Sequence, residues 1–431
     1  MPIALRLSRT GALTIAWLVV VPCLVLLLSV LVPIVPWLRI YASSVVPKFA
    51  SWIFISSLLA LLIALLADAV SNSRAARATI GVTALSTLAA AWIVLNLLYV
   101  AETNGAKIDM GAVLSMRSFS EGVPDARRIY ARPGGEAQWL DIYHPSGVGP
   151  YPASPVIIEV HGGGFVEGTR SFGSANMRWF ADRGWTVVSV DYRLASADRS
   201  TSDLATADVE CAMVWVRAHA SELNIDLDRV VLSGVSAGGS LAMDSAYAAN
   251  AGVATPSCSG PLPRVAAVIA QAPLVDAVDA WNYPGELQDK QRLYLTSYFG
   301  GSPAQFSKRY DAFDFRHRLY PSNPPTLILS GSQDPLIPPN ASEILALDAK
   351  KAGLKMRRIV FPYSGHDFNA RADSIANQAV VQIIHDYLID HGAGPVAAQE
   401  GRKSPSKLIK PRPRRYFGLC QADVAGEAGR C

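Results

Sequence analysis

The residues best suited to chemistry in this sequence form a Gly-x-Ser-x-Gly pattern, with Ser236 between Gly234 and Gly238. The pattern follows an apolar run at residues 230–232 and precedes a segment of helical character, which indicates a strand-to-helix junction. A turn this sharp leaves no room for side chains beside the serine, and it lifts the hydroxyl clear of the sheet. We therefore take Ser236 as the candidate nucleophile; the alternative is a tight turn that happens to contain serine.

A second pattern, His-Gly-Gly-Gly-Phe at residues 161–165, directly follows a largely β-branched run interrupted only by Glu159. Consecutive glycines expose backbone N–H groups that can stabilise the negative charge of a tetrahedral intermediate. We expect an oxyanion hole in which Gly163 and Gly164 donate from this loop and Ala237 donates from the residue after the nucleophile. A dinucleotide-binding loop would need Gly-x-Gly-x-x-Gly at the start of a helix, which this run does not supply.

A serine nucleophile needs a base to accept its proton and an acid to orient that base. His366 lies in a loop after the last predicted strand, and Asp334 follows the strand before it. The chain order Ser236, Asp334, His366 is the one expected when these loops leave the same edge of a parallel sheet. Three other aspartates could replace the acid, although loop carboxylates of this kind are usually solvated: Asp276, Asp311 and Asp314.

The elements that must position these loops alternate between strand and helix. Strands are predicted at residues 156–160, 186–190, 229–232, 265–270, 325–329 and 356–361, with helical segments between most of them. Such alternation predicts an α/β fold with a mainly parallel sheet and helices on both faces. Residues 127–132 and 137–143 add an antiparallel hairpin at one sheet edge, and an insertion rich in aromatic residues at about 275–321 is expected to form a small cap.

The motifs together resemble those of the α/β-hydrolase superfamily, and within it the carboxylesterases similar to hormone-sensitive lipase and their bacterial relatives. The resemblance covers about residues 127–392 and also includes Asp-Tyr-Arg-Leu at 191–194, Asp-Pro-Leu at 334–336 and Gly-His-Asp-Phe at 365–368. It implies an esterase that acts on fairly short or medium acyl chains without a cofactor. Val235 and Ile337 stand where many members of the group have acidic residues, which leaves the substrate class open.

The first hundred residues have a different character from the rest. The whole chain of 431 residues is 50% hydrophobic and only 17% charged, which is too apolar for an ordinary soluble protein of this size. Three apolar stretches, at about 12–34, 49–67 and 80–100, are each long enough to cross a bilayer as a helix. A cleaved signal peptide is the alternative for the first stretch, but its apolar run is too long and two more follow.

These patterns divide the chain into a membrane region (1–103), a linker (104–126), a hydrolase domain (127–392) and a disordered basic tail (393–431). An odd number of spans with the amino terminus inside places the hydrolase domain outside the cytoplasm, although the positive charges that flank the spans are nearly balanced. Cys211, Cys258, Cys420 and Cys431 are compatible with disulfides. Cys211 lies on an apolar helical face, which favours a buried core thiol.

The expected protein is therefore an integral membrane serine hydrolase whose substrate is a small-molecule or lipid ester. The same triad would also serve an amidase or a peptidase, and a non-catalytic membrane receptor or scaffold could keep the fold. No cluster of histidine and cysteine has metal-ligand spacing, so neither a metal nor another cofactor is expected. The basic tail is short and has few aromatic residues, which argues against a nucleic-acid partner, and nothing in the sequence indicates an oligomeric state.

Overall fold

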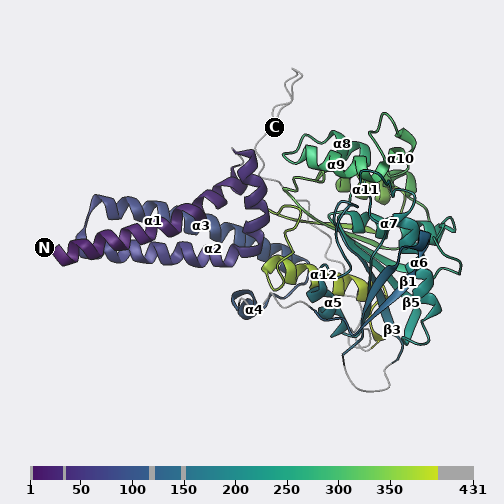
Figure 1. The fold of residues 1–431 in the computed structure, drawn as a ribbon. Coiled ribbons are helices and arrows are strands. Elements are labelled where there is room, and N and C mark those ends of the chain that lie inside the picture. Colours follow the sequence, from purple (N-terminus) through teal and green to yellow (C-terminus); the bar gives the residue numbers. More distant parts are fainter. Residues whose placement is uncertain (1–2, 33–34, 116–121, 147–151, 397–431) are drawn as a thin grey trace.

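The protein consists of a helical rod and an α/β domain in the computed structural model, which describes residues 3–32, 35–115, 122–146 and 152–396. The rod contains α1 (Ile3–Leu31), α2 (Pro36–Ser71) and α3 (Arg74–Thr103), and the amino terminus lies at the end remote from the α/β domain (Figure 1). All three helices are long and apolar enough to cross a membrane.

Small polar side chains lie where the rod helices meet, and apolar side chains face outward. The hydroxyls of Ser57 and Ser86 are 2.9 Å apart between α2 and α3, and the Thr83 hydroxyl donates to a carbonyl one turn earlier in its own helix. On the outer surface, Leu66 and Leu88 are each 69% exposed. Both features suit contact with lipid, because the hydroxyls find their hydrogen-bond partners inside the bundle and the exterior is apolar.

Helix α2 is longer than a bilayer crossing requires. Its 36 residues would extend over about 54 Å, compared with about 30 Å for a hydrocarbon core. Its helical geometry is interrupted at Phe49, two residues after Pro47. The segment before this kink, residues 36–48, lies beside the α/β domain and contacts its loops, as described below.

An eight-stranded sheet forms the centre of the α/β domain, in the order β1-β2-β4-β3-β5-β6-β7-β8. The pairs β1/β2 and β2/β4 are antiparallel, and all other neighbouring strands are parallel. The strands are β1 (Ala126–Ala131), β2 (Gln138–Tyr143), β3 (Ser154–Val160), β4 (Thr186–Val190), β5 (Ile225–Val235), β6 (Val265–Gln271), β7 (Thr326–Gly331) and β8 (Met356–Phe361). The predicted parallel sheet and edge hairpin are confirmed.

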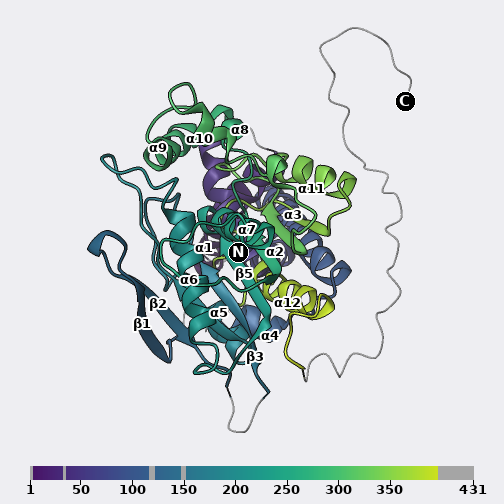
Figure 2. The same ribbon diagram turned by 90° about the vertical axis from the view of Figure 1, so that its right-hand side faces the viewer.

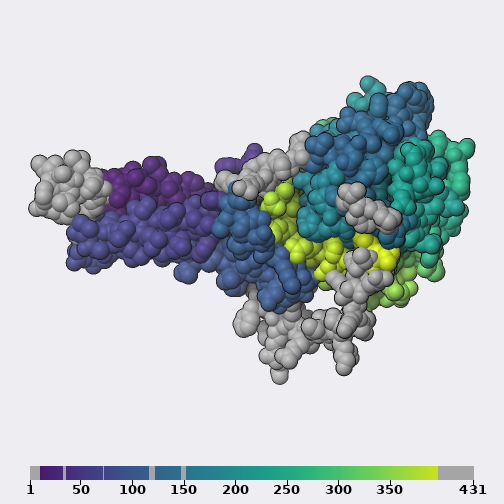
Figure 3. Space-filling view, turned by 90° about the horizontal axis from the view of Figure 1, so that it is seen from below, coloured from purple at the N-terminus to yellow at the C-terminus, as the bar shows by residue number. Residues whose placement is uncertain are grey.

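Alternate residues of the buried strands point to opposite faces of the sheet and build two cores. Leu232 packs toward α6 (Ala205–Ala218) and α7 (Ala237–Ala251), whereas Val231 packs toward α5 (Ser174–Ala181) and α12 (Ile375–Asp390). The second core continues into the rod through residues such as Val46 and Leu97. In Figure 3 the surface of α12, in yellow, accordingly borders the blue surface that includes the end of α3.

The insertion between β6 and β7 folds into short helices above the carboxyl edge of the sheet. It contains α8 (Ala277–Asn282), α9 (Gln288–Phe299), α10 (Ser307–Asp311) and the 3₁₀ turn η2 (Phe315–Arg318), and α8 to α10 cluster at one end of the domain (Figure 2). Five of its aromatic rings, Tyr298 and Phe313 among them, are buried, and these two rings pack edge to face. Helix α11 (Ala341–Lys351) follows β7.

The segments expected to be a linker and a tail are partly packed. Within residues 104–126, the short helix α4 (Met110–Leu114) buries Val113, and the side chain of Gln382 on α12 bonds the backbone of Lys107 at both its N–H and its carbonyl. Residues 116–121 of this segment lie outside the described residues. Of the predicted tail, Ala393 is buried and accepts a hydrogen bond from the Trp185 indole, while residues 397–431 lie outside the described part.

A 3₁₀ turn η1 (Pro133–Gly135) joins β1 to β2.

Cys211 and Cys258 form a disulfide that joins α6 to the loop after α7. The interpretation of Cys211 as a plain core thiol is therefore wrong. The apolar helical face around Cys211 was read correctly, because the residue is fully buried. Burial on such a face is equally compatible with a disulfide when a second cysteine packs against it, and the spacing of 47 residues gives no local signal of that contact.

Replacing both Cys211 and Cys258 by alanine should lower the free energy of unfolding by about 2–4 kcal/mol, because the cross-link restricts the unfolded chain. Denaturant titration of the detergent-purified protein, followed by tryptophan fluorescence, measures this change. A reducing agent should destabilise the parent by a similar amount and leave the double variant unchanged. A parent whose unfolding midpoint is insensitive to reductant would contradict the cross-link.

Candidate active site

The turn after β5 holds the candidate nucleophile in a strained backbone conformation. Ser236 has φ 56° and ψ −123°, a region that costs a residue with a side chain roughly 1–3 kcal/mol. Its N–H donates to the carbonyl of Gln271 at 2.7 Å. The flanking glycines are required because a Cβ at Gly234 would collide with the backbone of Gly238, and a Cβ at Gly238 would collide with the carbonyl of Val160.

Three side chains from separate loops meet at this turn. Nε2 of His366 lies 2.8 Å from Oγ of Ser236, and Nδ1 of His366 lies 2.6 Å from one carboxylate oxygen of Asp334. The other carboxylate oxygen accepts hydrogen bonds from the N–H groups of Leu336 and Ile337 at 2.8 and 2.9 Å. Hydrogen bonds thus run from a fixed carboxylate, through the imidazole, to the serine hydroxyl.

The surroundings of His366 raise the pKa of its imidazole above the ordinary value. Burial alone would lower this pKa, because it disfavours the charged ring. The charge of Asp334, its hydrogen bond to Nδ1 and the charge of Asp367 outweigh that effect. An imidazole in this environment is a stronger base toward a serine hydroxyl than an isolated one.

The glycine loop after β3 lies against the elbow. Gly163 and Gly164 have φ values of 122° and 59°, and both are crowded: a Cβ at Gly163 would collide with the carbonyl of Glu167, and a Cβ at Gly164 with the ring of Tyr294. Tyr294 belongs to α9 of the insertion, and its hydroxyl donates to Glu167 at 2.8 Å. The insertion therefore clamps the loop in place.

Three backbone N–H groups are expected to bind an oxyanion: those of Gly163, Gly164 and Ala237. None of them has a hydrogen-bond acceptor among the described residues. The residues that carry them line the same cavity as Ser236. His161, at the start of the loop, is 1% exposed and stacks on Tyr192 with ring centroids 4.4 Å apart, which makes it a support of the loop.

The alternative acids predicted from sequence do not reach the histidine. Asp276 and Asp314 both pair with Arg316 inside the insertion, and Asp311 is exposed on α10. Within the described ranges, no group of three or more histidine, cysteine, aspartate or glutamate residues could hold a metal ion.

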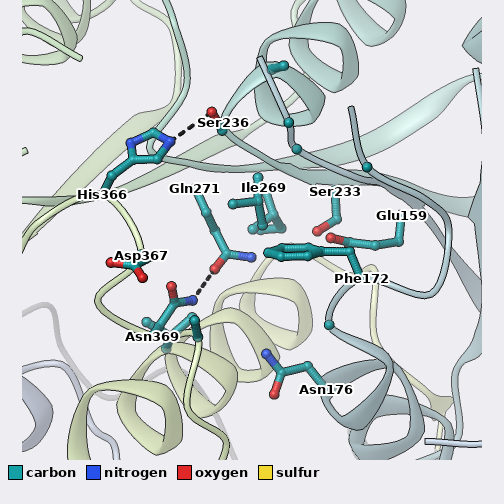
Figure 4. Close-up of a pocket in the computed structure, with 18 of the residues that line it drawn as sticks. Glu159, Phe172, Asn176, Ser233, Ser236, Ile269, Gln271, His366, Asp367 and Asn369 are labelled. Atoms are coloured by element: carbon teal, nitrogen blue, oxygen red, sulfur yellow. Dashed lines mark hydrogen bonds between the residues drawn. The ribbon is translucent and has the colours of Figure 1, made fainter. Parts of the chain in front are cut away.

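A cavity of about 550 Å³ opens at Ser236 and His366, within the usual size range of small-molecule sites. Figure 4 shows that it extends below the nucleophile, with Glu159, Ser233 and Phe172 on the side remote from His366. Of the aromatic residues in the insertion, all of which are described, only Tyr294 lines it. Several of the others are buried in the core instead: Tyr298, Phe299, Tyr310, Phe313 and Phe315.

Contacts that sequence reasoning missed connect the histidine loop to α2. The N–H of Gly365, the residue before His366, donates to the carbonyl of Ser43 at 2.8 Å. Nζ of Lys48 lies 2.6 Å from the carboxylate of Asp367, the residue after it. Both neighbours of the histidine are thus bonded to the segment of α2 that precedes its kink.

The rod also supports the aspartate loop and the rest of this interface. The side-chain amide of Gln333, next to Asp334, donates to the carbonyl of Val30 at 2.7 Å. Arg371 donates to the carbonyl of Lys48 at 3.0 Å, and Arg39 pairs with Glu286 of the insertion. The one sign of these contacts in the sequence is the presence of two basic residues, Arg39 and Lys48, between apolar stretches. We interpreted them as residues that flank the membrane.

This sheet order, with a nucleophile elbow after β5 and the acid and base loops after β7 and β8, defines an α/β-hydrolase fold. The BD-FAE family matches residues 140–348. Esterase LipQ of Mycobacterium tuberculosis is 26% identical over 277 residues, which are 62% of this chain and 64% of LipQ. Esterase LipC of the same organism is 36% identical over 115 residues, 26% of this chain and 28% of LipC.

Among solved structures, too, the chain is similar to proteins named as esterases. Native esterase 2 of Thermogutta terrifontis is 26% identical, with a TM-score of 0.51 over 62% of this chain and 92% of that one. Its propionate-bound form is 25% identical, with a TM-score of 0.51 over 62% and 94%. The chain thus spans less than two thirds of the curated relatives but nearly all of the solved esterase. The protein therefore has the α/β-hydrolase fold and is similar to proteins named as esterases, and the expected fold and resemblance are confirmed.

The rate at which a fluorophosphonate labels Ser236 should fall as the pH drops through the raised pKa of His366, because a protonated imidazole cannot accept the serine proton. The midpoint should therefore lie above the ordinary histidine value of about 6.5. In Asp334→Asn the midpoint should move down, since the charge that raises the pKa is gone while burial remains. The control Asp276→Asn should leave the midpoint in place; an Asp334→Asn midpoint equal to the parent's would contradict the assignment.

Proposed function

We propose that this protein is a membrane-anchored serine carboxylesterase that hydrolyses its substrate through an acyl-enzyme. The observation that carries the proposal is the line of hydrogen bonds from Asp334 through His366 to Ser236 at the mouth of a cavity. The names of its relatives, esterases LipQ and LipC among them, favour carboxylic esters as the substrates.

In the proposed reaction, Oγ of Ser236 attacks the ester carbonyl carbon while Nε2 of His366 takes the hydroxyl proton. The carbonyl electron pair moves onto oxygen, giving a tetrahedral oxyanion. Collapse of this intermediate breaks the bond to the leaving oxygen, which receives the proton from His366. Water then attacks the acyl-enzyme by the same two steps, the acid is released, and the serine regains its proton.

The oxyanion would be stabilised by the N–H groups of Gly163, Gly164 and Ala237, which lack acceptors among the described residues. Donors held rigidly at the site of developing charge need no reorganisation, and each is worth on the order of 3 kcal/mol in the barrier. Asp334 would hold the imidazole in the tautomer whose Nε2 accepts a proton, and stabilise the imidazolium that forms.

The size of the cavity and the relatives support acyl groups of short to medium length. The solved Thermogutta esterase has been obtained with propionate and with butyrate bound. A cavity of about 550 Å³ has room for a longer chain than either of these acids. The ester is further proposed to come from the membrane or from the compartment next to it, because the rod would hold the domain beside the bilayer.

The proposed orientation places the hydrolase domain outside the cytoplasm. The basic residues that flank the spans left the orientation open, but they differ in their surroundings. Arg39 and Lys48 pair with carboxylates of the hydrolase domain. Arg74 and Arg77, at the start of α3, lie at the end of the rod that also holds the amino terminus. Arg74 and Arg77 favour the far end as the cytoplasmic one. The Cys211–Cys258 disulfide also favours an oxidising compartment for the domain.

Replacing Ser236 by alanine should reduce kcat/KM for p-nitrophenyl butyrate by at least about 10⁴-fold, because the nucleophile of a triad cannot be replaced by water at comparable rate. The matched control is Ser221→Ala, an exposed serine before β5, which should retain parental activity. Activity of Ser236→Ala within tenfold of the parent would refute the proposed nucleophile.

A membrane-impermeant fluorophosphonate tests the orientation. In right-side-out vesicles of the cytoplasmic membrane, Ser236 should be labelled without detergent, and in inverted vesicles it should be labelled only after detergent is added. Ser236→Ala shows which band is specific. The reverse pattern would place the hydrolase domain in the cytoplasm.

A further inference from the structure

The cavity at Ser236 is polar in its middle and apolar at its far end. Residues earlier along the parallel strands lie farther from the carboxyl edge of the sheet, and those that line the cavity there, such as Val187 and Val231, are apolar. Ile384 and Leu388 of α12 also line the cavity and are apolar. Between them and the nucleophile lies a band of polar side chains, several of which are labelled in Figure 4: Glu159, Ser233, Gln271, Asn369, Asn176 and Asn377. A pocket for a plain hydrocarbon chain would have no use for this band.

Glu159 supplies the only carboxylate of this band within the described part of the chain. It is the penultimate residue of β3, on the same sheet face as Ile157, and its neighbour across β5 is Ser233. Ser233 lies three residues before Ser236. At about 3.3 Å per strand residue, the backbone of Ser233, and with it that of Glu159 alongside, lies within about 10 Å of the nucleophile along the strand direction.

No cation of the described residues pairs with Glu159. Burial raises the pKa of its carboxyl to about 7, and the only group that opposes this shift is the hydroxyl of Ser233. The partial exposure of the side chain is exposure to the cavity that it lines. A buried carboxyl that has a hydroxyl beside it but no cation costs free energy that a bound ligand can recover if the ligand offers a further hydrogen bond.

The amides of the band are held by bonds to one another. The Asn369 amide donates to the side-chain oxygen of Gln271 at 2.5 Å, and the Asn377 amide donates to the side-chain oxygen of Asn176 at 3.2 Å. The amide nitrogen of Gln271 points across the cavity toward Phe172 and Glu159 (Figure 4). Fixed amide donors and one carboxyl acceptor match a ligand group that both donates and accepts.

The position of the band relative to the histidine indicates which part of an ester would reach it. In the proposed mechanism His366 gives a proton to the leaving oxygen, so the alcohol part must lie on the side of the imidazole. Glu159 and Ser233 lie on the opposite side (Figure 4). The acyl part therefore enters the band, and its tail reaches the apolar end.

We propose that the cavity selects acyl groups that carry a hydroxyl on the chain, and that Glu159 is the residue that determines this specificity by accepting a hydrogen bond from that hydroxyl. The inference rests on the proposed esterase activity and narrows its substrate class. A hydroxyl suits the band better than an ammonium group, because the neighbouring amides are neutral and a second buried charge would need further compensation. A site built to bond a hydroxyl discriminates strongly against analogues that lack it.

The test compares p-nitrophenyl 6-hydroxyhexanoate with p-nitrophenyl heptanoate, in which a methyl group replaces the hydroxyl. For the parent, kcat/KM should favour the hydroxylated ester by at least tenfold, and Glu159→Leu should abolish or reverse that ratio. Glu159→Gln keeps a hydrogen-bonding group and should retain part of the preference. p-Nitrophenyl acetate, too short to reach Glu159, measures the esterase activity of the parent independently of the hydroxyl on the chain.

Each outcome is decisive for one of the two proposals. A parent that prefers heptanoate, or a ratio that is the same in the parent and Glu159→Leu, overturns the role of Glu159 while acetate hydrolysis still supports the esterase. If the parent hydrolyses none of the three p-nitrophenyl esters, the proposed esterase activity itself is overturned. If Glu159→Leu does not fold, judged by fluorophosphonate labelling of Ser236, the parental ratio together with that of Glu159→Gln decides the question.

Discussion

The site depends on a backbone turn that an isolated peptide would not adopt. Ser236 sits at positive φ, and the parallel neighbours of β5 hold it there: the Ser236 N–H bonds to the end of β6, and glycine at position 238 lets the turn touch the end of β3. A sheet is stiff along its hydrogen-bonded ladder, so the cost of the turn is met by the strands on either side. Because β3, β5, β7 and β8 are parallel, their carboxyl ends bring the glycine loop, the serine, the aspartate and the histidine to one edge.

Much of this architecture could be predicted from the sequence because its signals are local. Apolar β-branched runs mark the buried strands, and glycine-rich or Asp- and His-containing loops directly after them mark the edge where chemistry can occur. The order of Ser236, Asp334 and His366 along the chain then follows from the order of the strands. The three apolar helices are equally local, since each is visible as an uninterrupted stretch of hydrophobic residues.

The remaining features depend on contacts between distant segments, for which a single sequence carries little information. Cys211 and Cys258 each look unremarkable in their own surroundings. Glu159 was visible as an interruption of an apolar strand, but the other residues of the band come from β5, β6, α5, α12 and the loop before α12. Lys48 resembled a residue that flanks a membrane span, and only the position of Asp367 in space reveals its role as an ion-pair partner.

The rod and the hydrolase domain share one hydrophobic core, which runs from α1 to α3 through α12 to the sheet. Residues 36–48 of α2 bond to both neighbours of His366, and the same helix continues past its kink into the stretch long enough to cross a bilayer. If the rod spans a bilayer and His366 is the base, as proposed, the thickness and lateral pressure of the lipid would act on the imidazole through these bonds and would belong among the variables of the reaction, alongside pH and ionic strength. Detergent and vesicle preparations of the same polypeptide would then differ as catalysts, and rate constants from one would not transfer to the other.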